Sequence, residues 1–333
     1  MSSTQPPKAT TLHDVAQVAG VSFMTVSRAL NTPDRVSPAT LDKVRQAIAA
    51  TGYIPNLLAG GLKSRRSMTV VGLVPIISVA QFLPTVRALT EALDEQGYQL
   101  ILGQMGYDHA REDKLITTMM ARRPDGFVVI GKLNSAAARQ QLRTAGIPVV
   151  ETWDLVPDPV DMVVGFSHQQ VGRAVADHFL ARGLTRLVVA TGDDDRAQSR
   201  LAGFLERVGH EVPVVVNPAP SSLAHGRQAL TGLLKQDPQL QAVYCSSDVL
   251  AQGILVEAAA RGLRIPQDLA VCGFGDADFA EHLFPSLSSV RVDGAWIGRQ
   301  AAQMMLDRCA GKTPPERRVD VGFSVVARAS SGG

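Results

Sequence analysis

The 333-residue chain has few cysteines, and none of them has the close spacing of a metal site. The three stand far apart, at Cys245, Cys272 and Cys309. Cys245 and Cys272 lie in apolar runs typical of strands, where a free thiol behaves as a small apolar side chain. The cysteines therefore predict reduced, buried thiols and no metal centre.

The sequence also lacks a secretory leader and a membrane-spanning segment. Residues 1–8, Met-Ser-Ser-Thr-Gln-Pro-Pro-Lys, have no apolar core of the kind that a signal peptide needs. The most apolar stretch, residues 68–83, is interrupted by Gly, Pro, Ser and Gln and is shorter than a membrane span. We expect a cytoplasmic protein without a membrane partner.

No catalytic constellation is present. There is no Gly-x-Ser-x-Gly elbow and no Walker loop, and the glycines at 103–106 and 273–275 lack the dinucleotide-binding spacing. The seven histidines are scattered singly. Asp193–Asp195 offers carboxylates, but no partner ligand has a spacing that suits a metal, so a solvated loop is expected there. We expect no enzyme, no cofactor and no metal.

The net charge of +2 hides an uneven distribution. Residues 1–66 carry eight Lys or Arg and three Asp, a net charge of +5. The remainder has 25 basic and 28 acidic residues, a net charge of −3. A basic segment at one end of a mildly acidic body favours a polyanionic partner that contacts that end alone.

Residues 11–30 have the pattern of two short helices joined by a turn. The apolar stripe of the first helix consists of Leu12, Val15, Ala16 and Ala19. Gly20 breaks this helix, and Ser22 is placed to N-cap the second. The inner face of the second helix consists of Val26, Ala29 and Leu30. Its outer face consists of Phe23, Met24, Ser27 and Arg28. This pattern is typical of a helix-turn-helix that reads DNA.

A third helix and a linker follow. The helix is expected to begin with Ser37 as N-cap and Pro38 in the first turn, and to end at Gly52. Residues 56–63 contain two adjacent glycines, which make an isolated helix unstable there. This stretch predicts a linker, or a segment that folds only on contact with a partner.

From Thr69 onward, short β-branched runs alternate with helix-length amphipathic stretches. The strand-like runs are Val70–Val74, Gln99–Leu102, Phe127–Ile130, Val149–Val150, Arg186–Ala190, Val214–Val216, Ala242–Cys245 and Leu269–Cys272. The glycines expected to end helices in the left-handed conformation are Gly97, Gly146, Gly183, Gly209 and Gly262. Serial strand–helix units predict an α/β fold with doubly wound parallel sheets, and their number predicts two similar lobes.

Three blocks of the sequence resemble the lactose-repressor (LacI/GalR-type) family. They are Leu12-x-Asp-Val-Ala, Ala-Gly-Val-Ser-x-x-Thr-Val-Ser-Arg at 19–28, and Gly-Tyr-Ile-Pro-Asn at 52–56, in the family's order and spacing. The resemblance implies an all-α helix-turn-helix headpiece over 1–55, a hinge over 56–67 and a periplasmic-binding-protein-like core over 68–333. Lobe one is then expected at 68–165 plus 294–321, and lobe two at 166–293 plus 322–330.

The same resemblance assigns Phe23, Met24 and Arg28 to base edges in the major groove. Arg28 either makes a bidentate contact to guanine or contacts phosphate alone. Leu62 matches a hinge leucine that enters the minor groove, with Ala59 one turn earlier, although without the family Leu62 is simply an apolar linker residue. The other DNA-binding residues that the resemblance implies are Thr11, Ser22, Thr25, Ser27, Asn31, Arg35, Ser37, Thr40, Tyr53 and Asn56.

An effector pocket is expected between the lobes, at the carboxyl ends of the strands. Asp154 and Arg200 match family residues that bind effector hydroxyls or carboxylates, and Ser247 stands where relatives often have Asn. Lys132 is either a second cation of the pocket or a solvated loop residue. The other candidates are Ser78, Gln81, Phe82, Trp153 and Asp276.

One departure bears on the ligand. Relatives that bind neutral sugars usually have Asp where this chain has Gly275. Without that carboxylate, a pocket that keeps Arg200 is expected to be positive and to favour an anion. The runs Glu-Thr-Trp-Asp at 151–154 and Gly-Phe-Ser-His at 165–168 resemble the gluconate-repressor branch of the family.

The sequence thus predicts a homodimeric repressor of genes for sugar-acid uptake or catabolism, controlled by gluconate or ketogluconate. The absence of a Leu-rich heptad tail favours a dimer on a pseudo-palindromic operator. The alternatives are a regulator that responds to a neutral or phosphorylated sugar, a sugar-acid enzyme with a DNA-binding head, and a bare sugar receptor.

Overall fold

The computed structural model describes residues 10–54, 66–106 and 109–333. The chain divides into two units, one ending at Ser67 and the other beginning at Met68. The first unit contains α1 (Leu12–Ala19), α2 (Phe23–Asn31), η1 (Pro33–Arg35) and α3 (Pro38–Thr51). The expected caps are confirmed, since the Ser22 and Ser37 side chains accept hydrogen bonds from the first turns of α2 and α3. The residues buried between the helices include Val15, Val26, Val44, Ala47 and Tyr53.

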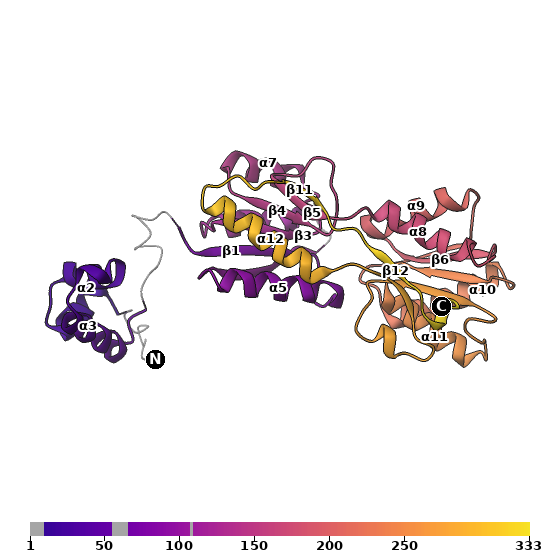
Figure 1. The fold of residues 1–333 in the computed structure, drawn as a ribbon, viewed down its shortest axis with the longest axis horizontal. Coiled ribbons are helices and arrows are strands. Elements are labelled where there is room, and N and C mark those ends of the chain that lie inside the picture. Colours follow the sequence, from indigo (N-terminus) through magenta and orange to yellow (C-terminus); the bar gives the residue numbers. More distant parts are fainter. Residues whose placement is uncertain (1–9, 55–65, 107–108) are drawn as a thin grey trace, which may run out of the picture. The chain divides into compact units, whose positions relative to one another are not determined.

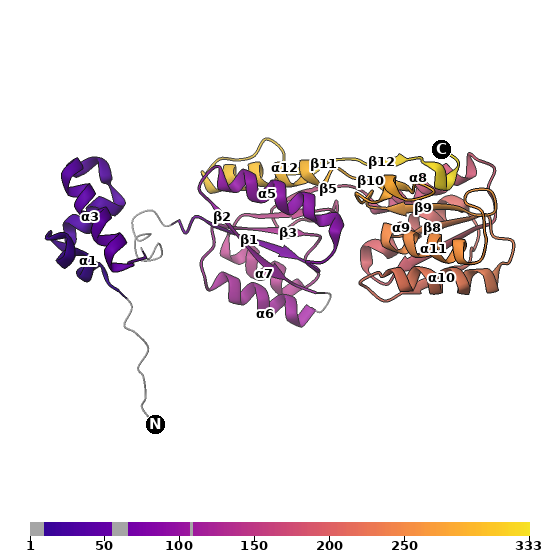
Figure 2. The same cartoon turned by 90° about the horizontal axis from the view of Figure 1, so that it is seen from below.

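Lobe one of the second unit has a six-stranded parallel sheet with helices on both faces (Figures 1 and 2). The strand order is β11 (Arg318–Asp320), β5 (Met162–Gly165), β4 (Val149–Thr152), β3 (Gly126–Ile130), β1 (Thr69–Val74) and β2 (Gln99–Gln104). One face is covered by α5 (Leu83–Asp94) and α12 (Gly294–Cys309), and the other by α6 (His109–Met120) and α7 (Ala136–Ala145). A short helix, η2 (Ala80–Phe82), precedes α5.

Lobe two repeats this arrangement with one exception. Its strand order is β12 (Ser324–Val326), β10 (Ser288–Arg291), β9 (Ala270–Phe274), β8 (Ala242–Cys245), β6 (Leu187–Gly192) and β7 (Val214–Asn217). Its helices are α8 (His168–Leu180), α9 (Asp195–Val208), α10 (Leu223–Gln236), α11 (Asp248–Ala260), η3 (Ala280–His282) and η4 (Ala329–Ser331). The exception is β12, which pairs antiparallel with β10. It follows β11 directly from the other lobe, so it runs away from the junction toward which the parallel strands point.

The chain passes between the lobes three times, at residues 166–167, 292–293 and 321–323. One buried apolar cluster extends through both lobes. It includes Val128 and Trp153 from lobe one, Val189 and Phe274 from lobe two, and Phe166 from the first connection. The five glycines expected to end helices all have positive φ, which confirms that prediction. No helix in the described ranges is long and apolar enough to cross a membrane.

Candidate functional site

The outer face of α2 presents the residues expected to read bases. Met24 is 64% exposed and Phe23 is 39% exposed, whereas Val26 on the inner face is fully buried. The Phe23 ring stacks on His13 of α1, with centroids 4.7 Å apart. The exposed Arg28 side chain forms no hydrogen bond or ion pair with any described residue. It is therefore available to a partner.

Several polar residues expected to contact phosphates also hold the helix ends. The Ser22 and Thr25 hydroxyls lie 2.9 Å apart, as do those of Ser37 and Thr40. Thr11 and Asp14 form a capping box at the start of α1. The Asn31 amide donates to the Ser27 carbonyl. Of the other predicted residues, Arg35 is exposed and Tyr53 is buried in the core of this unit. Three more predicted residues, Asn56, Ala59 and Leu62, lie outside the described residues.

A cavity of about 220 Å³ lies between the lobes of the second unit. Loops that follow β1 and β4 supply its lobe-one wall, and loops that follow β6, β7, β8 and β9 supply its lobe-two wall. This is the position expected for a ligand site, because the carboxyl ends of parallel strands from both sheets meet there. The cavity is smaller than the roughly 300–1,000 Å³ of drug-sized pockets, so it suits a small ligand.

Arg200, on α9, supplies a buried positive charge to this cavity. Its side chain is 5% exposed, and its guanidinium lies 4.0 Å from the centroid of the Phe274 ring. Nη2 donates to the Ser246 carbonyl at 2.9 Å, and Nη1 lies 3.0 Å from Nδ1 of His168. Burial and the Arg200 charge hold the pKa of His168 well below its usual range, so the ring is neutral and accepts this hydrogen bond. Arg200 forms no ion pair with a described carboxylate.

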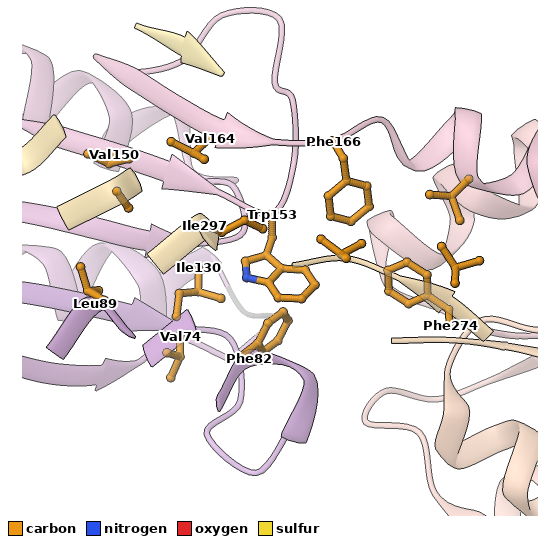
Figure 3. Close-up of a cluster of buried hydrophobic side chains, with 14 of the residues drawn as sticks. Val74, Phe82, Leu89, Ile130, Val150, Trp153, Val164, Phe166, Phe274 and Ile297 are labelled. Atoms are coloured by element: carbon orange, nitrogen blue, oxygen red, sulfur yellow. The ribbon is translucent and has the colours of Figure 1, made fainter. Parts of the chain in front are cut away.

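The aromatic rings of Phe82, Trp153 and Phe274 line the cavity. Figure 3 shows these rings within the buried apolar cluster. Trp153 is buried at φ 67°, an uncommon backbone conformation for a bulky residue. Its indole Nε1 donates to the Thr85 hydroxyl at 2.9 Å, so its polar edge is already satisfied within lobe one. Phe82 packs edge-on against it, with centroids 5.1 Å apart. Phe166 and Phe274 continue the cluster toward lobe two (Figure 3).

The loop after β9 is held by a buried carboxylate at the cavity. Asp248 accepts hydrogen bonds from the Ser289 hydroxyl at 2.6 Å and from the Ala277 backbone N–H at 2.7 Å. Burial raises the pKa of Asp248 to about 6. Gly275 has φ +122°, a conformation that L side chains rarely adopt, so this loop geometry favours glycine.

Two family models match the chain. They are the lacI family of bacterial regulatory proteins at residues 11–56 and a periplasmic binding protein-like domain at residues 176–331. The HTH-type transcriptional regulator GntR of Pseudomonas aeruginosa is 37% identical over 327 residues, covering 96% of this chain and 95% of its own length. The HTH-type transcriptional regulator IdnR of Escherichia coli is 30% identical, covering 94% and 96%. The chain belongs to the lacI family of bacterial regulatory proteins.

Solved structures agree with this assignment. A lacI-family regulator from Silicibacter pomeroyi superposes with a TM-score of 0.91 at 32% identity, covering 96% of this chain and 99% of that one. The CelR–cellobiose complex superposes with a TM-score of 0.70 at 29% identity, covering 96% and 99%. This lacI-family member is therefore a DNA-binding transcription regulator and not an enzyme, and its resemblance to the family is confirmed.

The structure divides the predicted effector residues of this lacI-family protein into two groups. Those that line the cavity are Ser78, Gln81, Phe82, Trp153, Arg200 and Ser247. The Ser247 hydroxyl also caps α11. Three others do not line it, namely Lys132, Asp154 and Asp276.

Each of these three side chains has a different environment. Lys132 lies in a second interlobe cavity, of about 320 Å³, where its Nζ is 2.9 Å from Asp195. Burial raises the pKa of Asp154, although the nearby charges of Lys132, Arg196 and Arg200 oppose that shift. The Asp276 carboxylate pairs with Arg291 at 2.5 Å and with Arg328 at 2.6 Å. It fixes the loop after β9 and is not free for a ligand.

The charge of the cavity also differs from the prediction. Two arginines line it, Arg196 and Arg200, together with two aspartates, Asp194 and Asp248. The absence of a carboxylate at Gly275 therefore does not give the cavity a net positive charge. Both aspartates are already engaged, Asp248 by the loop after β9 and Asp194 as the N-cap of α9. The arginine donors remain the groups that a ligand can use.

Sequence reasoning missed several lining residues. They include His168, Asp194, Arg196, Ser246, Asp248 and Phe274. Arg196 carried a usable signal, since it stands four residues before Arg200 and thus on the same face of one helix. Two of the aspartates before it have partners elsewhere in the chain, since Asp193 accepts a hydrogen bond from the Ala219 N–H and Asp195 pairs with Lys132 of lobe one. The described residues contain no group of three or more side chains that could hold a metal.

Proposed function

We propose that this protein is a repressor whose operator affinity is controlled by a sugar acid, gluconate or a ketogluconate, bound in the cavity between the lobes. The observation that carries the proposal is Arg200, a buried guanidinium that lines the cavity without an ion pair. A buried cation without a counter-ion is destabilising, and a carboxylate ligand supplies one together with charge-assisted hydrogen bonds.

The shape of the cavity supports the same ligand class. Its volume of about 220 Å³ suits a monosaccharide-sized acid better than a disaccharide such as the cellobiose named with CelR. Trp153 offers an apolar wall for the carbon chain, while Gln81 and Ser78 offer hydrogen bonds to hydroxyls. The name GntR of the Pseudomonas aeruginosa relative agrees with the gluconate-repressor branch that the sequence resembles.

Fluorescence titration tests the proposed ligand. Because Trp153 lines the cavity, gluconate and 2-ketogluconate are expected to change its emission, and glucose is not. The chain has one other tryptophan, Trp296, so a Trp296→Phe variant isolates the signal. The same acids should change operator affinity by roughly 5–150-fold, and operator DNA should change their affinity by the same factor. A response to glucose alone would contradict the proposal.

For the headpiece, we propose that two copies in a homodimer read a pseudo-palindromic operator, with Arg28 donating to guanine. Arg28→Ala is expected to reduce the preference among operator variants by roughly 1–3 kcal/mol at the base it reads. Binding to a panel of operators that differ by one base pair measures this. Equal weakening on every sequence, with a salt dependence reduced by about one counter-ion, would instead make Arg28 a phosphate contact.

The matched control for Arg28 is Arg45→Ala. Arg45 is another exposed arginine of the same unit, on α3, where it lies 3.5 Å from Asp42. Its replacement is expected to leave the preference among operators unchanged.

A further inference from the structure

The Arg196 side chain extends from lobe two and packs against lobe one. It stands in the first turn of α9, one turn before Arg200. Its guanidinium lies over the Phe82 ring, 5.1 Å from the centroid, and its side chain is only 12% exposed. Phe82 belongs to η2 in lobe one. Arg196 therefore has its present surroundings only while the two lobes face each other around the cavity.

The hydrogen-bonding capacity of Arg196 is not filled. Its Nη1 is buried and has no hydrogen-bond partner. The nearest described carboxylate is that of Asp194, whose Oδ1 is 3.9 Å from Nε and already accepts from the Ala197 N–H at 3.1 Å. A buried donor on a charged group that lacks an acceptor is destabilising. Arg196 lines both cavities between the lobes, so a ligand bound there can supply the acceptor that Nη1 lacks.

The two arginines also act on each other. The charge of Arg196 adds to burial in lowering the pKa of Arg200, so the two guanidinium groups lie close enough to repel. Both line the same cavity, and neither has a carboxylate close enough for a short ion pair. An anionic group between them would relieve the repulsion and accept hydrogen bonds from both.

We infer that Arg196 is a second specificity-determining residue of the effector site, which binds the anionic group of the ligand jointly with Arg200. Because its guanidinium rests on Phe82, affinity for the anion then depends on the apposition of the lobes. This inference rests on the proposed function, since it assumes that the effector is an acid. Through Arg196, which packs on Phe82 of lobe one, the acid group of the ligand interacts with both lobes.

Calorimetric titration with gluconate and with glucitol, a neutral analogue of the same carbon chain, tests Arg196. Arg196→Gln is expected to weaken gluconate binding by roughly 10–100-fold, whereas glucitol, which has no acid group, should bind the wild type and the variant equally weakly. Arg196→Lys keeps the charge but not the planar fork, so an intermediate loss is expected. The control is Arg207→Gln on the same helix, where Arg207 pairs with Asp177 at 2.5 Å and is half exposed. It should bind gluconate as the wild type does.

The outcomes separate this inference from the proposed function. Wild-type affinity for gluconate in Arg196→Gln would overturn the role of Arg196, while the proposed function would stand if Arg200 variants lost that affinity. A wild-type protein that binds no sugar acid would overturn both. If Arg196→Gln fails to fold, Arg196→Met replaces it, because its side chain keeps the packing on Phe82, and the same loss is expected.

Discussion

Replacing Arg200 with glutamine is expected to abolish the response to gluconate while operator binding remains within about two-fold of the wild type. The ligand carboxylate loses its buried counter-ion and at least one charge-assisted hydrogen bond, so affinity should fall by roughly 100-fold or more. The headpiece lies in the first unit, which ends at Ser67, and the sequence of that unit is unchanged. Trp153 fluorescence measures ligand binding, and anisotropy of a labelled operator measures DNA binding.

Arg207→Gln is the matched control for Arg200→Gln. Arg207→Gln changes an arginine of the same helix that faces Asp177 and does not line the cavity. It should respond to gluconate normally. An undiminished gluconate response in Arg200→Gln would show that the acid is bound elsewhere or that the effector is not an acid.

Features that depend on neighbouring residues could be predicted from the sequence. Ser22 and Ser37 cap helices through backbone N–H groups three residues later, and Gly209 ends α9 within the same turn of chain. The positions of the central strands followed from β-branched runs because strands such as β3, β6 and β8 are buried on both faces. The candidate cavity followed from topology, since Arg200, Trp153 and Ser247 each stand just after a strand or in the first turns of the next helix.

Features that depend on distant pairing could not be predicted in this way. Asp276 follows a strand just as Trp153 does, yet its two arginine partners come 15 and 52 residues later. Lys132 also follows a strand, but Asp195 from the other lobe holds its ammonium group in the second cavity. Nothing local to these residues indicates which carboxylate each cation meets. The folding of lobe two determines the partners of Asp276, and the apposition of the two lobes determines the partner of Lys132.

Helices α8 and α9 pack backbone against backbone at Gly172, so a substitution there is expected to have a large effect. A Cβ at Gly172 would lie 1.9 Å from the Arg200 carbonyl oxygen and 2.6 Å from the Phe204 nitrogen. Both are backbone atoms, so no side-chain rotation relieves the contact, and the helices must separate. Gly172→Ala is expected to lower the free energy of unfolding by about 3 kcal/mol or more. Because α9 carries Arg200, the variant should also bind gluconate more weakly. Urea unfolding and fluorescence titration measure the two effects.

Gly232→Ala provides the matched control for this packing argument. Gly232 also lies within a helix, α10, but a Cβ there would meet only a Val215 methyl group at 3.5 Å, an ordinary contact. Alanine is the better helix former by about 1 kcal/mol, so this variant should be as stable as the wild type or slightly more stable. The difference in unfolding free energy between the two variants then measures the cost of placing a Cβ where the two helix backbones are in contact. If both unfold at the same urea concentration, α8 and α9 do not pack backbone against backbone at Gly172, and the position of Arg200 does not depend on that contact.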